Sequence, residues 1–321
     1  MNYGIPYKGS KSKIAQQIIN CIPSAENFYD LFCGGGAITH CAILEGRWKN
    51  YVLNDISDGV TKLFVDAVNG KYKNEKRWIS REEFFKLKDT DAYVRYIWSF
   101  GNNGRDYMFS KEIEETKRLG HNAIVFGDIK PLEKLLNIDL SFLLKIDDLS
   151  ERRKTFCRVM KKLNESEYLQ RNQILERLEC LVRLQELQQL QQLQQLERLQ
   201  QLQRLDNISN KLINLNQDYR NVEIKSNSVI YCDIPYKDTD GYERKTNKSS
   251  FDYDSFYNWC EKQTEPVFIS EYTMPDNRFK CIMEIEKTSS YCATNNNKKT
   301  VEKLFIPRCQ EDVSIKQLSL F

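Results

Sequence analysis

The chain has 321 residues, of which 40% are hydrophobic and 29% are charged, and its formal net charge is +3. This length suits one sizeable α/β core with an insertion, or two domains. No run of about 18 apolar residues occurs, which argues against a membrane-spanning helix. The polar, basic N-terminus lacks the apolar core of a signal peptide, so we expect a cytoplasmic protein without a membrane partner.

The ten cysteines are scattered through the chain, and the two histidines are His40 and His121. Because no C-x-x-C pair occurs, the spacing of a zinc site is absent and we expect no metal. We interpret the cysteines as small, reduced residues of the core. Local basic stretches at residues 8–13, 152–162 and 244–248 are interpreted as solvated surface faces.

The first third of the chain alternates between predicted strands and helices. Apolar runs at residues 27–32 and 51–53 indicate buried strands, and helical patterns occupy residues 12–21, 37–45 and 56–68. Such a β-α-β-α order predicts a parallel sheet with helices on its faces.

The middle of the chain has a different character. Residues 69–162 are rich in charged and aromatic side chains, and we predict a mostly helical insert there, with a Gly/Asn-rich loop at residues 98–105. Leucine then recurs at every third residue from Leu175 to Leu205. Strong helix formers fill this tract, but a step of three residues advances only about 300° on an α-helix. A helix and a short-period solenoid both stay open, and the tract is interpreted as a spacer, a brace or an element of self-association.

Strand signals return in the last hundred residues, at 228–232, 267–270, 279–285 and 301–306. A helix is predicted at residues 253–261, with Asp252 as its N-cap. The second part of the sheet is therefore expected to come from the C-terminal part of the chain.

A triple-glycine turn, Gly34 to Gly36, follows the first predicted strand and opens the next helix. Such a turn lets a ligand approach the backbone closely. Asp55 follows the second strand, where an acid can accept hydrogen bonds from ribose hydroxyls. Thr39 replaces the third glycine of a dinucleotide motif, which argues against a nicotinamide cofactor. The two features together indicate a nucleoside-containing cofactor, and each alone would also fit an ordinary turn or a helix N-cap.

Asp233-Ile234-Pro235-Tyr236 follows directly on a predicted apolar strand, at the edge where open α/β sheets bind ligands. A carboxylate and a backbone carbonyl there can accept both N–H groups of an aromatic amine, which increases the electron density on its nitrogen. An aromatic ring can hold a base that has left the duplex stack, and the proline restricts the loop. The alternative is a surface turn with a buried tyrosine.

With these residues in place, the sequence resembles phage and bacterial DNA adenine methyltransferases of the Dam type. Five motifs carry the resemblance, in the order of the family: Pro6 to Lys11 (PYKGSK), Asp30 to Gly35 (DLFCGG), Asn54 to Ile56 (NDI), Ser99 to Asn102 (SFGN) leading to Arg105, and Asp233 to Tyr236 (DIPY). The first, second and third correspond to cofactor motifs, the fourth to the recognition insert and the fifth to the catalytic motif.

The resemblance implies an α/β fold with a Rossmann-like, mostly parallel methyltransferase sheet built from residues 1–68 and 216–321. An inserted helical target-recognition domain would span residues 69–165, and a leucine-rich triplet-repeat segment residues 166–215. The implied activity is site-specific N6 methylation of a flipped adenine in double-stranded DNA, with S-adenosyl-L-methionine as the cofactor.

The resemblance also implies roles for individual residues. The cofactor would be contacted by Tyr7, Lys11, Asp30, Phe32, Gly34, Gly36, Asp55 and Asp233. The catalytic motif would consist of Asp233, Ile234, Pro235 and Tyr236. The residues that would contact DNA are Lys8, Asn102, Asn103 and Arg105.

Ile234 departs from the commoner family motif, which has proline there, but the backbone carbonyl is retained. A cytosine N4-methyltransferase is the alternative enzyme, and Asp233 argues against it because those enzymes more often carry serine at that position. A C5-cytosine enzyme would need a Pro-Cys nucleophile motif, which is absent. A non-catalytic DNA-binding or scaffold protein is the alternative from another class.

Overall fold

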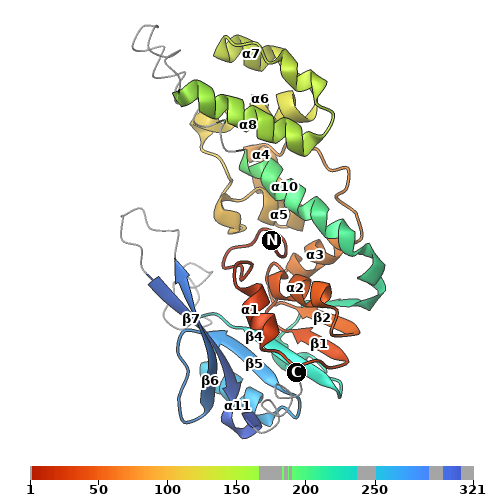
Figure 1. The fold of residues 1–321 in the computed structure, drawn as a ribbon, viewed down its shortest axis with the longest axis vertical. Helices are drawn as coiled ribbons and strands as arrows, with labels where there is room; N and C mark the ends of the chain where they lie inside the picture. Colours follow the sequence, from red (N-terminus) through yellow and green to blue (C-terminus); the bar gives the residue numbers. More distant parts are fainter. Residues whose placement is uncertain are drawn as a thin grey trace. The chain divides into compact units, whose positions relative to one another are not determined.

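A seven-stranded sheet connects the two ends of the chain in the computed structural model, which describes residues 2–165, 183, 187, 190–236, 251–288 and 299–311. The strand order is β3-β2-β1-β4-β5-β7-β6 (Figure 1). The first five are parallel, and β7 runs antiparallel to both β5 and β6. The strands are β1 (Asn27–Asp30), β2 (Asn50–Asn54), β3 (Leu212–Leu215), β4 (Ser228–Asp233), β5 (Val267–Glu271), β6 (Phe279–Thr288) and β7 (Lys299–Pro307).

The chain divides into two compact units, one made of residues 1–70 and 202–321 and one of residues 71–201. We call them the sheet unit and the helical unit. This mixed α/β architecture with a mostly parallel sheet confirms the fold class expected from the sequence. No described helix of either unit combines the length and the apolar character that a membrane crossing requires.

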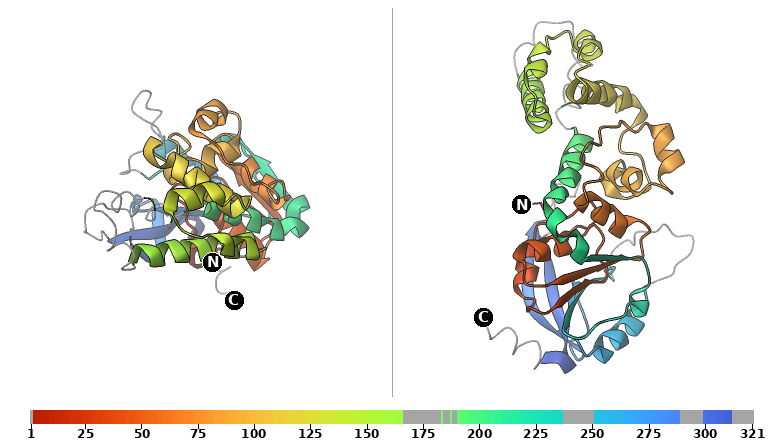
Figure 2. Two further views of the ribbon diagram at one scale, coloured as in Figure 1. Left: turned by 90° about the horizontal axis from the view of Figure 1, so that it is seen from above. Right: turned by 90° about the vertical axis from the view of Figure 1, so that its right-hand side faces the viewer.

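Helices cover both faces of the sheet. The described α-helices of the sheet unit are α1 (Ala15–Asn20), α2 (Ala37–Glu45), α3 (Val60–Val68) and α11 (Tyr253–Lys262). The red helix α1 and the blue helix α11 lie on opposite sides of the sheet (Figure 2). Asp252 caps α11 by accepting a hydrogen bond from the Ser255 amide, which confirms the predicted N-cap.

Alternate residues of the strands supply the two faces of the core, as the period of two requires. Tyr29, Ile230 and Ile269 pack with α11 in one buried cluster. Phe28 faces the other way and contacts Trp48, with ring centroids 4.9 Å apart. Because the central strands are buried on both sides, their sequences are nearly continuous apolar runs, as expected for parallel sheets.

One strand was not predicted. β3 occupies Leu212–Leu215, inside the range assigned to the leucine-rich segment, and pairs in parallel with β2. It is an edge strand with half-buried and exposed residues. The other strands were predicted as buried apolar runs, and β3 is not buried in this way.

The helical unit confirms the mostly helical insert. Its described α-helices are α4 (Arg81–Leu87), α5 (Ala92–Ile97), α6 (Lys111–Val125), α7 (Lys130–Leu136), α8 (Leu149–Glu165) and α10 (Gln191–Gln201), with short described 3-10 turns η1 (Phe100–Asn102) and η2 (Ser141–Lys145). A second apolar cluster, which includes Ile124, Leu132, Phe156 and Met160, forms its core.

The leucine tract is helical where the structure describes it, so the solenoid alternative does not apply to residues 191–205. Leu193, Leu196 and Leu199 are all buried although they spiral around α10, and Leu190, directly before this helix, is buried as well. At Leu202 the α-helix gives way to a ten-residue 3-10 helix, η4 (Leu202–Lys211). A 3-10 helix has three residues per turn, so the triplet spacing there places leucines on one face. The earlier part of the tract lies largely outside the described residues.

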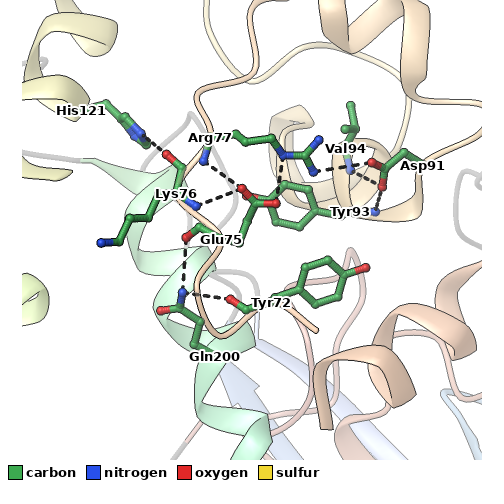
Figure 3. Close-up of polar contacts among 9 residues, drawn as sticks. All are labelled: Tyr72, Glu75, Lys76, Arg77, Asp91, Tyr93, Val94, His121 and Gln200. Carbon is green, nitrogen blue, oxygen red and sulfur yellow. Dashed lines mark hydrogen bonds and ion pairs between the residues drawn. The ribbon is translucent and has the colours of Figure 1, made fainter. Parts of the chain in front are cut away.

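The two ends of the helical unit are joined by a hydrogen-bond clamp. Gln200, near the end of α10, donates its amide to the backbone carbonyls of Tyr72 (3.0 Å) and Lys73 (3.1 Å). Glu75 is held beside them by Arg77, and His121 contacts the Lys76 carbonyl at 3.0 Å (Figure 3). The end of the leucine tract therefore acts as a brace for the segment that begins this unit.

Candidate active site

Three carboxylates lie at the carboxyl ends of neighbouring parallel strands. Asp30 and Asp233 are the last residues of β1 and β4, and Asp55 follows β2 directly. In the register of the sheet, Asp30 lies opposite Leu53 of β2 and Tyr231 of β4. The strand order reverses between β1 and β4, and such a switch point is where open α/β sheets bind their ligands.

The glycine turn is held against Asp55. The Gly34 amide donates to Asp55 Oδ2 at 2.7 Å, and the Ser57 amide donates to Asp55 Oδ1 at 2.7 Å. Gly34 has a φ of +46°, which favours glycine, and a Cβ atom there would lie 2.8 Å from the Tyr7 ring. Burial raises the pKa of Asp55, while the two amides oppose that shift. The N-cap of α3 is Gly59, so Asp55 does not cap that helix.

The N-terminal segment folds over this turn. The Ile5 amide donates to the Gly35 carbonyl at 2.8 Å, and the Gly4 amide donates to His40 Nδ1 at 2.9 Å. Tyr7 packs its ring beside Gly34, and its contact with a cofactor stays a prediction. This arrangement carries Lys11 to the end of β4, across 222 residues of sequence.

Asp30 carries the strongest sign of an incomplete site. Its side chain is 1% exposed, and Oδ2 accepts a hydrogen bond from the Thr39 hydroxyl at 2.8 Å. Its other oxygen, Oδ1, is buried and has no hydrogen-bond partner among the described residues. Burial, with a smaller contribution from the nearby Asp233 and Asp55, raises the pKa of Asp30 to about 8, while the hydrogen bond from Thr39 opposes this shift. A donor or a positive charge from a ligand would satisfy this group.

Lys11 is buried among acids and an aromatic ring. Its Nζ lies 2.7 Å from Asp233 Oδ1 and 3.5 Å from Glu302 Oε1. It also lies 4.6 Å from the centroid of the Tyr236 ring. The interpretation of residues 8–13 as a solvated face is thus wrong for Lys11, whose exposure is 5%. A buried ammonium needs such anions to offset its lost hydration.

The Asp233–Tyr236 motif, predicted to be catalytic, begins at the last residue of β4. Asp233 is partly exposed, Ile234 is buried and Pro235 is exposed. The Pro235 carbonyl accepts a hydrogen bond from the Tyr253 hydroxyl at 2.8 Å, which ties the motif to the start of α11. The Tyr236 ring meets Tyr272 edge to face, with centroids 4.4 Å apart. The alternative of a surface turn therefore fits only part of this motif, because Asp233 and the Tyr236 ring take part in a buried network of contacts.

Other predicted cofactor residues have structural neighbours. Phe32 packs against Tyr219 and Phe256 in the apolar cluster, with ring centroids 5.3 and 5.8 Å away. Gly36 begins α2 with a φ of +66°, and a Cβ there would lie 2.7 Å from Phe64. Their contact with a cofactor stays a prediction. The packing alone explains why a phenylalanine occupies position 32 and a glycine occupies position 36.

The predicted DNA-contacting residues of the insert stabilise their own loop. The Asn102 side chain donates to the Tyr96 carbonyl and to Gln195, each at 2.8 Å. Asn103 Oδ1 accepts hydrogen bonds from the amides of Arg105 and Asp106. Lys8 of the sheet unit is exposed. Contact of these residues with DNA stays a prediction.

Two general expectations need correction. Among the described cysteines, Cys281 and Cys309 are exposed, so they are free thiols but not core residues. Cys180 and Cys292 lie outside the described residues. In the second basic stretch, Arg153 is 8% exposed and pairs with Glu197, so it is not part of a solvated face. The third stretch, 244–248, lies outside the description.

Glu302 and Tyr272 were not predicted. Glu302 is 1% exposed and accepts a hydrogen bond from the Tyr236 hydroxyl. The available signal was a charged pair, Glu302 and Lys303, inside a predicted strand whose other residues are apolar. Its partner, however, lies 66 residues earlier in the sequence.

The sheet order, the acids at its carboxyl edge and the motif after β4 together define a Rossmann-like methyltransferase. The family model of the D12 class N6 adenine-specific DNA methyltransferases matches residues 7–264, and the chain belongs to that family. Comparison with curated protein sequences gives no significant match. The protein is therefore an enzyme that methylates the N6 amine of adenine in DNA. This confirms the Dam-type interpretation over the cytosine and scaffold alternatives.

Proposed function

We propose that S-adenosyl-L-methionine is the methyl donor and that it binds at the carboxyl ends of β1 and β2. The observation that carries this proposal is the buried Asp30 Oδ1, which lacks a hydrogen-bond partner among the described residues. The surrounding acids suit a ligand that carries a sulfonium and an ammonium, since a nearby positive charge favours ionised carboxylates. When bound, this cofactor supplies a methyl group activated for attack by a nitrogen nucleophile.

The glycine turn and Asp55 would hold the nucleoside part of the cofactor. Asp55 is fixed by the amides of Gly34 and Ser57, and each carboxylate oxygen can accept more than one hydrogen bond. It would accept the ribose hydroxyls without losing the bonds that fix it. The space beside Gly34 is limited by Tyr7, whose ring would cover the turn.

Asp233 and the Ile234 carbonyl would accept the two N–H groups of the adenine amine. These bonds would increase the electron density on N6 and aim it at the methyl group, so that positioning and electrostatics provide most of the catalysis. Lys11, 2.7 Å from Asp233, favours the ionised form of the acid that this role needs. The target adenine must leave the duplex stack, and Tyr236 would provide the aromatic face that holds it.

The helical unit would recognise the target sequence in double-stranded DNA, within the proposed recognition insert of residues 69–165. The loop of residues 98–105 supports this role, because Asn102 and Asn103 already fix its backbone and would present Arg105 in a defined conformation. Lys8 would contact DNA from the sheet unit. The leucine tract would serve as a brace or in self-association, and the protein would act in the cytoplasm of a bacterium or a phage-infected cell.

Calorimetric titration with S-adenosyl-L-methionine tests the cofactor proposal. Asp55→Asn should weaken binding about tenfold or more, since it removes a charge-assisted hydrogen bond to the ribose. Asp58→Asn is the matched control, because Asp58 is exposed and lies three residues later. Asp233→Ala should keep most of the affinity and lose methyl transfer. Equal affinity of the wild type and Asp55→Asn would refute the assigned ribose site.

A further inference from the structure

Glu302 lies at the same edge of the sheet as the catalytic motif. In the antiparallel register of β5 and β7, Glu271 lies opposite Lys303, so Glu302 lies just beyond the carboxyl end of β5. Its side chain is 2% exposed. A buried carboxylate is costly unless hydrogen bonds and cations compensate it, so the contacts of Glu302 define what it does.

Two groups of the catalytic region converge on one oxygen of Glu302. The Tyr236 hydroxyl donates to Oε1, and Lys11 Nζ lies 3.5 Å from the same atom. Burial, together with Asp233 and Glu302, raises the pKa of Tyr236, so its hydroxyl keeps the proton that it donates. Tyr236 is therefore the donor of this contact and Glu302 is the acceptor.

These contacts fix two groups relative to each other. The ammonium of Lys11 lies between Asp233, at 2.7 Å, and Glu302, at 3.5 Å. Three neighbours contact Tyr236. Glu302 accepts a hydrogen bond from its hydroxyl, Lys11 lies over its ring, and the rings of Tyr236 and Tyr272 meet edge to face. Removal of the Glu302 carboxylate takes away this hydrogen bond of the Tyr236 hydroxyl and the ion pair at 3.5 Å from Lys11 Nζ.

We propose that Glu302 is a positioning residue: it fixes the Tyr236 hydroxyl and shares Lys11 with Asp233, and so sets the spacing between the ring and the acid that receive the adenine. The proposal rests on the proposed function, which gives Asp233 and Tyr236 those roles. Glu302 acts through its neighbours and has no contact with the reacting amine. Its loss should therefore reduce kcat more than it reduces the affinity for S-adenosyl-L-methionine.

Steady-state methylation of DNA with Glu302→Gln and Glu302→Ala tests this role. The Gln side chain can still accept from the Tyr236 hydroxyl but no longer attracts Lys11, so kcat should fall about tenfold. Removal of both contacts in Glu302→Ala should lower kcat about 100-fold, the scale of a misplacement near 1 Å. The dissociation constant for the cofactor should change less than about twofold in both variants, since uniform binding is retained. Glu284→Gln is the control, because this carboxylate on β6 is 58% exposed and pairs with Lys303.

A double-mutant cycle with Tyr236→Phe separates positioning from a general structural role. If Glu302 acts through the tyrosine hydroxyl, Tyr236→Phe with Glu302→Ala should be no slower than the slower single variant. The inference would be overturned if the kcat losses of the two single variants multiplied in the double variant. Wild-type kcat in both Glu302 variants, with Asp233→Ala inactive, would also overturn it, and both outcomes leave the proposed function intact. Activity retained in Asp233→Ala would instead overturn the proposed function on which the inference rests. Glutamine has nearly the same shape as glutamate, so Glu302→Gln still tests the inference if Glu302→Ala does not fold.

Discussion

The glycine that begins α2 allows a quantitative test of the turn on which the cofactor site is built. Gly36 and Gly46 flank the same helix and have nearly the same backbone conformation, with φ of +66° and +68°. A Cβ at Gly36 would lie 2.7 Å from Phe64, whereas a Cβ at Gly46 would have no atom within 4 Å. Alanine at either position therefore carries the same backbone strain, and only Gly36→Ala adds a steric clash.

The backbone strain of a left-handed alanine costs about 1–2 kcal/mol. Overpacking in a closed core adds about 1–3 kcal/mol. Gly36→Ala should thus lower the free energy of unfolding by about 2–5 kcal/mol, the sum of these two effects. Gly46→Ala should lower it by about 1–2 kcal/mol, from strain alone.

Urea denaturation of the two variants and the wild type, with unchanged slopes, gives these differences directly. The quantity that matters is the gap between the two variants, because the shared strain cancels in it. Equal losses of stability in Gly36→Ala and Gly46→Ala would refute the close approach of the turn to Phe64. A larger loss for Gly46→Ala would refute it as well.

Three further predictions concern stability. Because burial raises the pKa of Asp30 to about 8 from 3.8, the folded protein retains a proton that the unfolded chain releases. The free energy of unfolding should then fall as the pH rises from about 4 to about 8, and Asp30→Asn should flatten this slope in denaturation curves measured across that range. Gln200→Ala should destabilise the protein by about 1–3 kcal/mol, because it removes two side-chain hydrogen bonds to the backbone carbonyls of residues 72 and 73, although the Glu75 amide still donates to the first, whereas the exposed Gln201→Ala should have little effect. Arg153→Met should cost about 3 kcal/mol, because it leaves the largely buried Glu197 unpaired, and a second change, Glu197→Leu, should restore much of that loss in the same assay.

Local patterns in the sequence were sufficient for most of the sheet unit. The helix at residues 37–45 and the strands around residues 228–232 and 267–270 were predicted nearly to the residue, because glycines or polar residues bound each apolar run. β3 was missed for a physical reason. As an edge strand it needs little burial, and its four residues form a short run directly after the leucine tract and the mostly polar residues 206–211.

The leucine tract shows the limit of periodicity on its own. A step of three residues fits a 3-10 helix better than an α-helix, yet residues 191–201 are α-helical and the 3-10 form begins only at Leu202. Leu193, Leu196 and Leu199 of this α-helix are buried, and their burial stabilises the α-helical form. Tertiary packing thus decides between two helices that the repeat alone leaves close in energy.

Contacts at the candidate site depended on topology more than on motifs. Asp55 and Asp233 could be placed at this edge because each follows a predicted strand. Asp30 lay inside the range predicted for its strand, and the structure places it at the end of β1. Lys11 and Glu302 could not be assigned to Asp233 and Tyr236 from spacing, since 222 and 66 residues separate these partners. The antiparallel return of β7 brings Glu302 to this edge, and no local pattern encodes that register.

The central claim is that this edge of the sheet transfers a methyl group to the adenine amine through Asp233. The most direct test incubates the purified protein with tritiated S-adenosyl-L-methionine and unmethylated DNA, digests the DNA and identifies the labelled nucleoside, with Asp233→Ala in parallel. The account predicts label in N6-methyladenosine from the wild type and none from the variant. Equal label from Asp233→Ala, or label in a cytosine product, would contradict it.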